Sequence, residues 1–323
     1  MNHEHNFSVH FWGVRGSHPV PGENTTRYGG NTSCVEVRAG GETLVFDAGS
    51  GIIGLGKVLA AQARPETENA NLAIKLFFSH LHHDHTQGLP FFNPLYIPGA
   101  ELDFYVPNIF GREPDQILQE VMAAPHFPVS FQMTAANKRL HAVHETSALQ
   151  LGGEDGPRVL AMRSYAHPQG VMIYRVDWQG WSMVYATDTE GYVNGDQRLV
   201  EFSRGADLLI HDAQYTQEHY VGRLAGAPVT QGFGHSTAQM ACETAQAAGV
   251  GQLLLFHHDP NYADSTIAEI ERQARQTFPN ALAAREGMCV QLARKPAQNQ
   301  AEETLPVAKI QRSRPQGKAW AGA

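Results

Sequence analysis

An apolar run that ends in a cluster of histidines constrains this chain more than any other feature of its sequence. Residues 72–78 are mostly apolar, which is typical of a buried strand. The next seven residues read Ser-His-Leu-His-His-Asp-His. Side chains two apart on an extended segment point to the same side, so His80 and His82 can reach one point together. Asp84 and His85 follow where the chain must turn, and they can face a second point close by.

Imidazole and carboxylate groups in this arrangement predict a site for divalent metal ions. Two imidazoles at one point, with a carboxylate and an imidazole at another, suit borderline metals such as zinc. Five of the six positions from 80 to 85 carry possible ligand atoms. We therefore favour a metal site over a polar loop that is merely rich in histidine. The side chain of His83 points away from the point shared by His80 and His82, and we expect it to be structural.

Composition limits the classes of protein to which the chain can belong. Its 323 residues fit one large α/β domain, and a hydrophobic content of 42% supports a sizeable core. The sequence has no apolar run long enough for a membrane span, and its polar start lacks the apolar stretch of a secretory signal. Three cysteines at wide spacing indicate a reducing compartment rather than a disulfide framework. A net charge of −8 disfavours long nucleic acid as a partner, so we expect a cytoplasmic enzyme.

Short apolar segments recur in both halves of the chain and predict two β-sheets. The expected strands lie at about 7–13, 33–38, 43–47, 72–78, 148–151, 158–164, 171–177, 181–187, 207–211, 253–256 and 288–292. Helices are expected up to about residue 62, over 115–122, up to about 248 and from about 264 to 278. Two sheets packed face to face, with helices outside, accommodate this order. We favour Asp47 as a cap of the first helix over a role in orienting the metal loop.

Two segments differ in character from the rest of the predicted domain. Residues 93–140 are rich in proline and look like an insertion near the site, either a lid or substrate wall or a packed excursion. His126, in the sequence Pro-His-Phe-Pro, is the candidate substrate contact within it. Beyond Lys295 the chain turns polar, and we expect a disordered tail over 296–323 rather than a nucleic-acid-binding arm. A single folded domain is therefore predicted to cover residues 1–295.

Further candidate residues lie at strand ends and beside glycine-rich loops. In the second half these candidates are His167, Asp188, Asp212, His235 and His257. His257 and His258 both follow the last long apolar strand, and alignment with that strand favours His257 as a ligand. In the first half, Asn31, Thr32 and Ser33 follow a glycine-rich loop that could hold a phosphate, although loop structure alone also accounts for them.

The pattern His-x-His-x-Asp-His at residues 80–85 resembles the metal-binding signature of the metallo-β-lactamase superfamily. The resemblance covers about residues 7–293 and implies an αββα sandwich with two metal ions. It implies that one ion is held by His80, His82 and His167, the other by Asp84, His85 and His257, with Asp188 bridging both. The best-known β-lactamases have a cysteine at the bridging position, so the aspartate points away from β-lactam hydrolysis. Zinc is favoured, and these ligands would also accept manganese or iron.

Two loops of the second half resemble loops of the ribonuclease Z branch of this superfamily. Residues 211–215 resemble its His-Glu-Ala-Thr loop, with Asp212 in place of the glutamate, and residues 235–237 resemble its His-Ser-Thr loop. The resemblance implies a phosphodiesterase in which a metal-bridging hydroxide attacks phosphorus, with Asp84 among the catalytic residues. His235, oriented by Asp212, would donate a proton to the leaving alkoxide. The aspartate shortens the reach of this pair, and the alternative for His235 is a helix-cap neighbour without a catalytic role.

The expected substrate is a small or cyclic phosphodiester. The loop containing Asn31, the segment containing His126 and residues 186–190 resemble bacterial phosphodiesterases of cyclic phosphates or cyclic nucleotides. Ribonuclease Z enzymes that process tRNA carry a long arm for which the 20 residues between His167 and Asp188 leave no room. We expect neither long nucleic acid nor a membrane as partner, and a homodimer is compatible with the sequence. The alternatives are a ribonuclease Z-like nuclease and a lactonase-type hydrolase.

Overall fold

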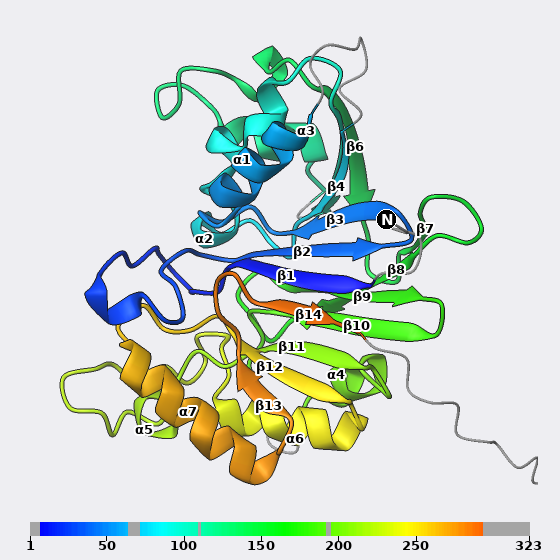
Figure 1. Cartoon of the computed structure of the whole chain (residues 1–323). Helices are drawn as coiled ribbons and strands as arrows, with labels where there is room; N and C mark the ends of the chain where they lie inside the picture. Colours follow the sequence, from blue (N-terminus) through cyan, green and yellow to red (C-terminus); the bar gives the residue numbers. More distant parts are fainter. Residues whose placement is uncertain (1–6, 64–71, 109–110, 192–194, 293–323) are drawn as a thin grey trace, which may run out of the picture. The chain divides into compact units, whose positions relative to one another are not determined.

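Two seven-stranded sheets form the framework of the part of the chain that the computed structural model describes, residues 7–63, 72–108, 111–191 and 195–292 (Figure 1). The first sheet has the order β14 (Cys289–Gln291), β1 (Ser8–Gly13), β2 (Cys34–Ala39), β3 (Glu42–Phe46), β4 (Ala73–Phe77), β5 (Glu101–Pro107) and β6 (Asn137–Val143). The second has the order β13 (Ala281–Ala283), β12 (Gln252–Phe256), β11 (Leu208–Asp212), β10 (Trp181–Ala186), β9 (Val171–Trp178), β8 (Arg158–Ser164) and β7 (Ala148–Gln150).

Helices flank both sheets and complete the sandwich (Figure 1). The longer helices are α1 (Ile52–Gln62) and α3 (Pro114–Val121) beside the first sheet, and α4 (Gln197–Phe202), α6 (Ala238–Ala248) and α7 (Asp264–Thr277) beside the second. The short elements are α2 (His83–Thr86), α5 (Gln217–Tyr220), η1 (Glu23–Thr25), η2 (Leu89–Phe91), η3 (Asn93–Tyr96) and η4 (Phe131–Met133). The predicted α/β class and αββα sandwich are confirmed.

Aromatic side chains fill the space between the two sheets. The ring of Phe46 on β3 lies 5.5 Å from that of Tyr185 on β10, and the ring of Phe11 on β1 lies 6.1 Å from that of Phe256 on β12. Separate apolar clusters lie between each sheet and its helices, as alternating side chains of a strand face opposite sides. Both faces of each sheet are therefore covered in this part of the chain.

Parallel strands bring several candidate residues to one edge of the sandwich. β3 runs parallel to β4, and β11 runs parallel to both β10 and β12. The carboxyl ends of parallel neighbours lie at the same edge, which is where ligands bind in many α/β proteins. The candidates at or just after these ends are Asp47, His80, Asp188, Asp212 and His257.

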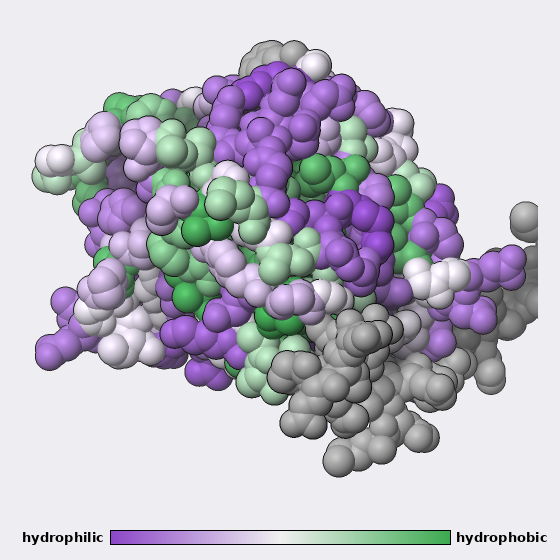
Figure 2. All heavy atoms as spheres, turned by 90° about the horizontal axis from the view of Figure 1, so that it is seen from above, coloured by the Kyte–Doolittle hydropathy of each residue, from purple (hydrophilic) through white to green (hydrophobic). Residues whose placement is uncertain are grey.

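Residues 93–140, which the sequence suggests as an insertion, are partly integrated into the first sheet. β5 pairs in parallel with β4 and β6, so two strands of the sheet come from this segment. Between them, α3 packs against β6 and η4 packs against α3. Seen from the α1–α3 side, apolar residues form separate patches among hydrophilic ones (Figure 2).

Two expectations concern features outside this framework. The tail over residues 296–323 lies outside the described residues. Within the described ranges, none of the helices combines the length and apolar character that a membrane span requires.

Candidate metal centre

Three histidines from two loops form the first ligand group. The ring nitrogens of His80, His82 and His167 all lie within 4.8 Å of one another. His80 and His82 follow β4, and His167 follows β8 of the other sheet. The Nε2 atom of His167 lies 3.1 Å from the Nδ1 atom of His82. Two ligands of a tetrahedral zinc ion are about 3.3 Å apart, so this spacing suits a shared metal ion.

A second group of four residues lies next to the first. It consists of Asp84, His85, Asp188 and His257, whose ligand atoms also lie within 4.8 Å of one another. The Nε2 atom of His257 lies 3.1 Å from Oδ2 of Asp84 and 3.3 Å from Oδ2 of Asp188. All four residues are buried. His258, the competing residue, instead places its Nε2 atom 2.9 Å from the carbonyl of Ala284.

Asp188 lies between the two groups. Its Oδ1 atom is 3.7 Å from Nε2 of His80, whereas its Oδ2 atom is 3.3 Å from Nε2 of His85. Each carboxylate oxygen thus faces a different ligand group, as a bridging ligand requires. The backbone of Asp188 has a φ of 52°, and such strained conformations of non-glycine residues are concentrated at functional sites.

The chemistry of the ring nitrogens fits a bound cation. The Nε2 atoms of His80 and His85 are buried and have no hydrogen-bond partner, which is rare for polar atoms in protein interiors. Their Nδ1 atoms lie 3.1 Å from Ser79 Oγ and 2.8 Å from Asp47 Oδ2, respectively. Contacts on the outer nitrogen fix a ring so that its inner nitrogen faces the centre. The donor set therefore fits divalent metal ions.

The surroundings favour a neutral imidazole at two of the ligands and an ionised carboxylate at Asp188. At His85, by contrast, burial is outweighed by the nearby carboxylates, which raise the pKa well above its ordinary value. Burial lowers the pKa of His80 well below its ordinary value and that of His167 to about 4, so both rings are neutral at pH 7. Burial opposes ionisation of Asp188, but the imidazoles of His257, His85 and His80 outweigh it and hold the pKa of this carboxyl well below its usual range. Neutral imidazoles and ionised carboxylates are the forms that bind metal.

Asp47 supports the second group, and its preferred role as a helix cap was wrong. Helix α1 begins only at Ile52, and its N-cap is Gly51. The Asp47 carboxylate instead accepts hydrogen bonds from the backbone N–H and hydroxyl of Ser79, both at 2.7 Å, and from the Tyr185 hydroxyl at 2.8 Å. Its fourth contact is with His85. Asp47 therefore orients the metal loop, because β3 lies next to β4.

His235 and Asp212 form a pair beside both groups. The Nδ1 atom of His235 lies 2.7 Å from Oδ2 of Asp212, so the shorter side chain does reach the ring. The His235 ring is 5.0 Å from those of His167 and His257. Burial opposes its charge, but the Asp212 carboxylate raises the pKa of His235 to about 9. His235 is therefore protonated at neutral pH.

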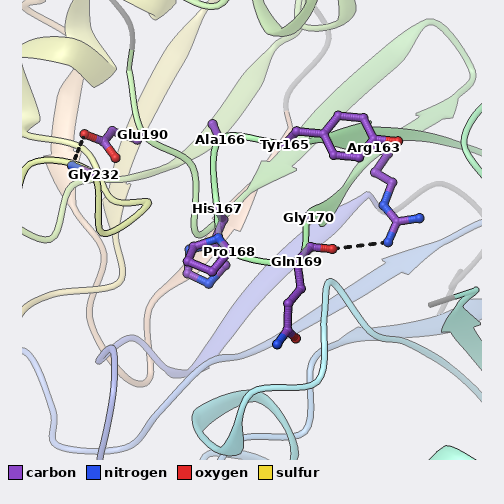
Figure 3. Close-up of a pocket in the computed structure, with 9 residues that line it drawn as sticks. All are labelled: Arg163, Tyr165, Ala166, His167, Pro168, Gln169, Gly170, Glu190 and Gly232. Atoms are coloured by element: carbon purple, nitrogen blue, oxygen red, sulfur yellow. Dashed lines mark hydrogen bonds between the residues drawn. The ribbon is translucent and has the colours of Figure 1, made fainter. Parts of the chain in front are cut away.

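Glu190 holds the loop that carries His235, which the sequence did not indicate. Its carboxylate accepts hydrogen bonds from the backbone N–H groups of Gly232 at 2.8 Å and Gly234 at 3.0 Å, and from the Tyr220 hydroxyl. A cavity of about 640 Å³ lies between Glu190 and His167 on one side and Arg163 on the other (Figure 3). The glutamate in Thr-Asp-Thr-Glu, directly after a strand end, was the available signal.

The glycine-rich loop contacts the centre through its backbone. The N–H of Ser17 donates to Oδ2 of Asp84 at 2.7 Å, and a side chain at Gly16 would collide with the His257 ring, 2.4 Å from its nearest atom. The candidates Thr32 and Ser33 are fully buried. Asn31 donates to Glu286 at 2.9 Å. Thr32 and Ser33 therefore lie in the protein interior, whereas Asn31 is only partly buried, and a contact of these residues with substrate stays a prediction.

His126 and His83 line one cavity and belong to neither ligand group. Both are exposed and line a cavity of about 820 Å³ that also borders Phe91 and Phe127. We call this space the aromatic cavity. His126 is thus at a cavity beside the metal loop, whereas His83 belongs to no ligand group of the described residues.

Sequence comparison finds ribonuclease Z proteins among the relatives of this chain. A ribonuclease Z of Brevibacillus brevis is 28% identical over 251 residues, which cover 64% of this chain and 75% of that protein. A ribonuclease Z of Pyrococcus horikoshii is 25% identical over 318 residues, covering 86% and 94%.

Solved structures share the fold. A diphosphatase of the PhnP family superposes with a TM-score of 0.64 at 18% identity, covering 89% of this chain and 98% of that one. The short form of human tRNase Z superposes with a TM-score of 0.58 at 21% identity, covering 88% and 98%. The sequence model of the "Beta-lactamase superfamily domain" matches residues 42–258, most of the chain. This chain is therefore a hydrolase that belongs to the metallo-β-lactamase superfamily.

Proposed function

We propose that the chain is a metal-dependent phosphodiesterase that acts on a small or cyclic phosphodiester. The observation that carries this proposal is the position of Asp188 between two ligand groups, with His235 alongside. One carboxylate oxygen facing each group suits two adjacent metal ions, and a protonated imidazole beside them suits a leaving alkoxide. Relatives named ribonuclease Z and a structural neighbour named as a diphosphatase support chemistry at phosphorus.

The residues that would hold the metal ions follow from the two groups. One ion would bind the three histidines of the first group, the other would bind Asp84, His85 and His257, and Asp188 would contact both. When bound, a pair of divalent cations lowers the pKa of water and neutralises charge on phosphate oxygens. Zinc is favoured by the number of imidazoles, and manganese or iron would also suit the ligands.

His235 would supply the proton for the leaving group. Its Nδ1 atom is engaged by Asp212, which leaves Nε2 as the donating atom. The raised pKa of His235 keeps that proton in place at neutral pH until an alkoxide forms. Asp212 also accepts a hydrogen bond of 2.8 Å from the backbone N–H of Ser236, so the carboxylate is fixed in position. The ring cannot turn away without breaking these contacts.

The connection between His167 and Asp188 supports a small substrate. β9 and β10 occupy most of it and pair as an antiparallel hairpin within the second sheet. A hairpin that belongs to the sheet provides no arm with which to hold a long RNA. A nuclease acting on RNA is the second candidate, because the curated relatives are ribonuclease Z proteins.

A panel of four substrates tests the proposal. The full chain, loaded with zinc or manganese, is assayed with a cyclic nucleotide, bis(4-nitrophenyl) phosphate, a lactone and an RNA oligomer. We expect both small phosphodiesters to be hydrolysed with a higher kcat/KM than the RNA. Faster cleavage of RNA would favour the nuclease, and turnover of the lactone alone would remove the phosphodiesterase. Asp188→Asn, which keeps the side-chain shape, is the inactive control.

A further inference from the structure

The aromatic cavity is lined by chain neighbours of the first ligand group. Leu81 and His83, which line it, are adjacent in sequence to His80 and His82, although their side chains turn to the other side of the segment. Gln169, on the same cavity wall, comes two residues after His167. His82 is only partly buried, whereas His80 is 2% exposed, so the group is most accessible at His82. The cavity wall and the first ligand group thus share two segments of the chain, residues 80–83 and 167–169.

Two phenylalanine rings give the cavity its shape. Phe91, at the end of η2, is 54% exposed, which is unusual for a side chain of this size. Its ring centre lies 5.6 Å from that of Phe127, and the two ring planes are at 85° to each other. The rings thus form a corner in which a flat group stacked on one ring meets the other edge to face. Both arrangements are favourable for aromatic pairs.

The charge of the cavity excludes an anionic occupant. Its two residues with fixed charge, Arg112 and Glu120, form an ion pair with each other. Thr86 donates its hydroxyl hydrogen to the carbonyl of His82, and Gln87 donates to Thr32 Oγ1. The apolar wall, which includes Ile117 of α3, is thus left without a free charge to attract phosphate. A neutral, flat occupant suits this lining best.

The size of the cavity fits one such occupant. Its volume of about 820 Å³ lies within the roughly 300–1,000 Å³ typical of small-molecule sites. One or two fused rings fit this space, whereas a stacked run of nucleotides needs an open, positively charged groove.

We propose that the aromatic cavity binds a planar aromatic group carried by the substrate's phosphodiester, so that the preferred substrates are aryl or nucleobase-bearing diesters. This inference rests on the proposed function, because it places the phosphorus at the metal centre. Selection among phosphodiesters would then depend on Phe91 and Phe127.

Calorimetric titration of the zinc-loaded full chain with three ligands tests this inference without turnover. Methylphosphonate reports binding at the metal centre alone, phenylphosphonate adds a simple aryl group, and adenosine 5′-monophosphate adds a nucleobase. We expect phenylphosphonate or the nucleotide to bind at least about 5-fold more tightly than methylphosphonate, the lower end of typical stacking gains. The better of the two aromatic ligands identifies whether an aryl group or a nucleobase is preferred.

Substitutions test whether the higher affinity for the aromatic ligands comes from the aromatic cavity. Phe91→Ala should remove most of the extra affinity for the aromatic ligands. Affinity for methylphosphonate should stay within about twofold, because half of the Phe91 side chain is exposed and its loss should disturb the fold little. Phe127→Leu keeps apolar volume without the ring and should act in the same direction. Met133→Ala, a matched control that is 75% exposed in the same segment but does not line the cavity, should change neither affinity.

The outcomes separate this inference from the function on which it rests. Methylphosphonate binding with no gain from either aromatic ligand would overturn the cavity assignment alone. An aromatic gain that survives both phenylalanine substitutions would also overturn it. If methylphosphonate fails to bind the zinc-loaded chain, the proposed function falls, and the cavity assignment falls with it.

Discussion

The metal centre and the aromatic cavity adjoin, but they are built in opposite ways. The centre gathers buried polar side chains from strand ends of both sheets, and partners at 2.7–3.1 Å hold its rings from behind, as Asp47 holds His85. The cavity is walled by short helices and loops, and Phe91 on its rim is half exposed. Sheet ends provide the precision that catalysis needs, whereas loops are free to vary. The difference is consistent with the two proposals, in which the centre carries the reaction and the cavity selects the substrate.

Removal of the metal ions from the centre should have the largest effect on activity and on stability. With chelator, hydrolysis of every substrate should fall below detection, because the proposed reaction depends on metal-activated water. The free energy of unfolding should fall by about 4 kcal/mol for each site that had held metal at 1,000 times its Kd. Thermal melting and assays with and without chelator check this, and added zinc should restore both. Activity that persists without metal would contradict the account.

His235→Ala should have the next largest effect. We expect kcat for an alkyl diester to fall by about 10²–10⁴, because the leaving alkoxide loses its proton donor. The loss should be smaller for a nitrophenyl diester, whose leaving group needs no proton. Parallel kinetics on the two substrates measure the difference, and unchanged metal content is the control. An equal loss on both substrates would remove the acid role of His235.

Asp47→Asn should weaken metal binding without abolishing the reaction. The substitution leaves the shape but removes the charge that orients His85, and such partners are typically worth about 10–100-fold in metal affinity. Tyr185→Phe is the matched comparison, because it removes only one of the donors to Asp47. Competition with a chromogenic chelator measures both affinities. If the two variants lose affinity equally, the orienting role of the Asp47 charge is wrong.

Salt should have the smallest effect. A small diester makes few charged contacts, so we expect its kcat/KM to change by less than about twofold between 50 and 200 mM salt. A protein that neutralises 6–10 phosphates loses about 10³–10⁵ in affinity over this range. Assays at three salt concentrations are sufficient. A steep dependence would shift the assignment toward a nucleic acid bound along a charged groove.

The sequence was informative where chemistry depends on local pattern. The alternation that placed His80 and His82 on one side, and the apolar runs before them, needed only the geometry of a strand. The sandwich followed from the order of these runs. Such features can be predicted because neighbouring residues determine them.

Contacts between distant segments could not be predicted in the same way. From the sequence a helix cap was the favoured role of Asp47, and only the parallel pairing of β3 with β4 brings it to His85, 38 residues later. The reach of Asp212 to His235 likewise depends on Glu190, which draws the loop of Gly232 and Gly234 toward the centre. From the shorter side chain of Asp212 alone, we expected a weaker contact with His235 than a glutamate would make. Register and loop anchoring decided both cases.

The central claim is that the two ligand groups act as one dinuclear site for phosphodiester hydrolysis. Its most direct test is a titration of metal-free protein with zinc while hydrolysis of bis(4-nitrophenyl) phosphate is followed. The account predicts that activity rises until two equivalents per chain are bound and then stays constant. Full activity at one equivalent, or no hydrolysis at any ratio of zinc to protein, would contradict it.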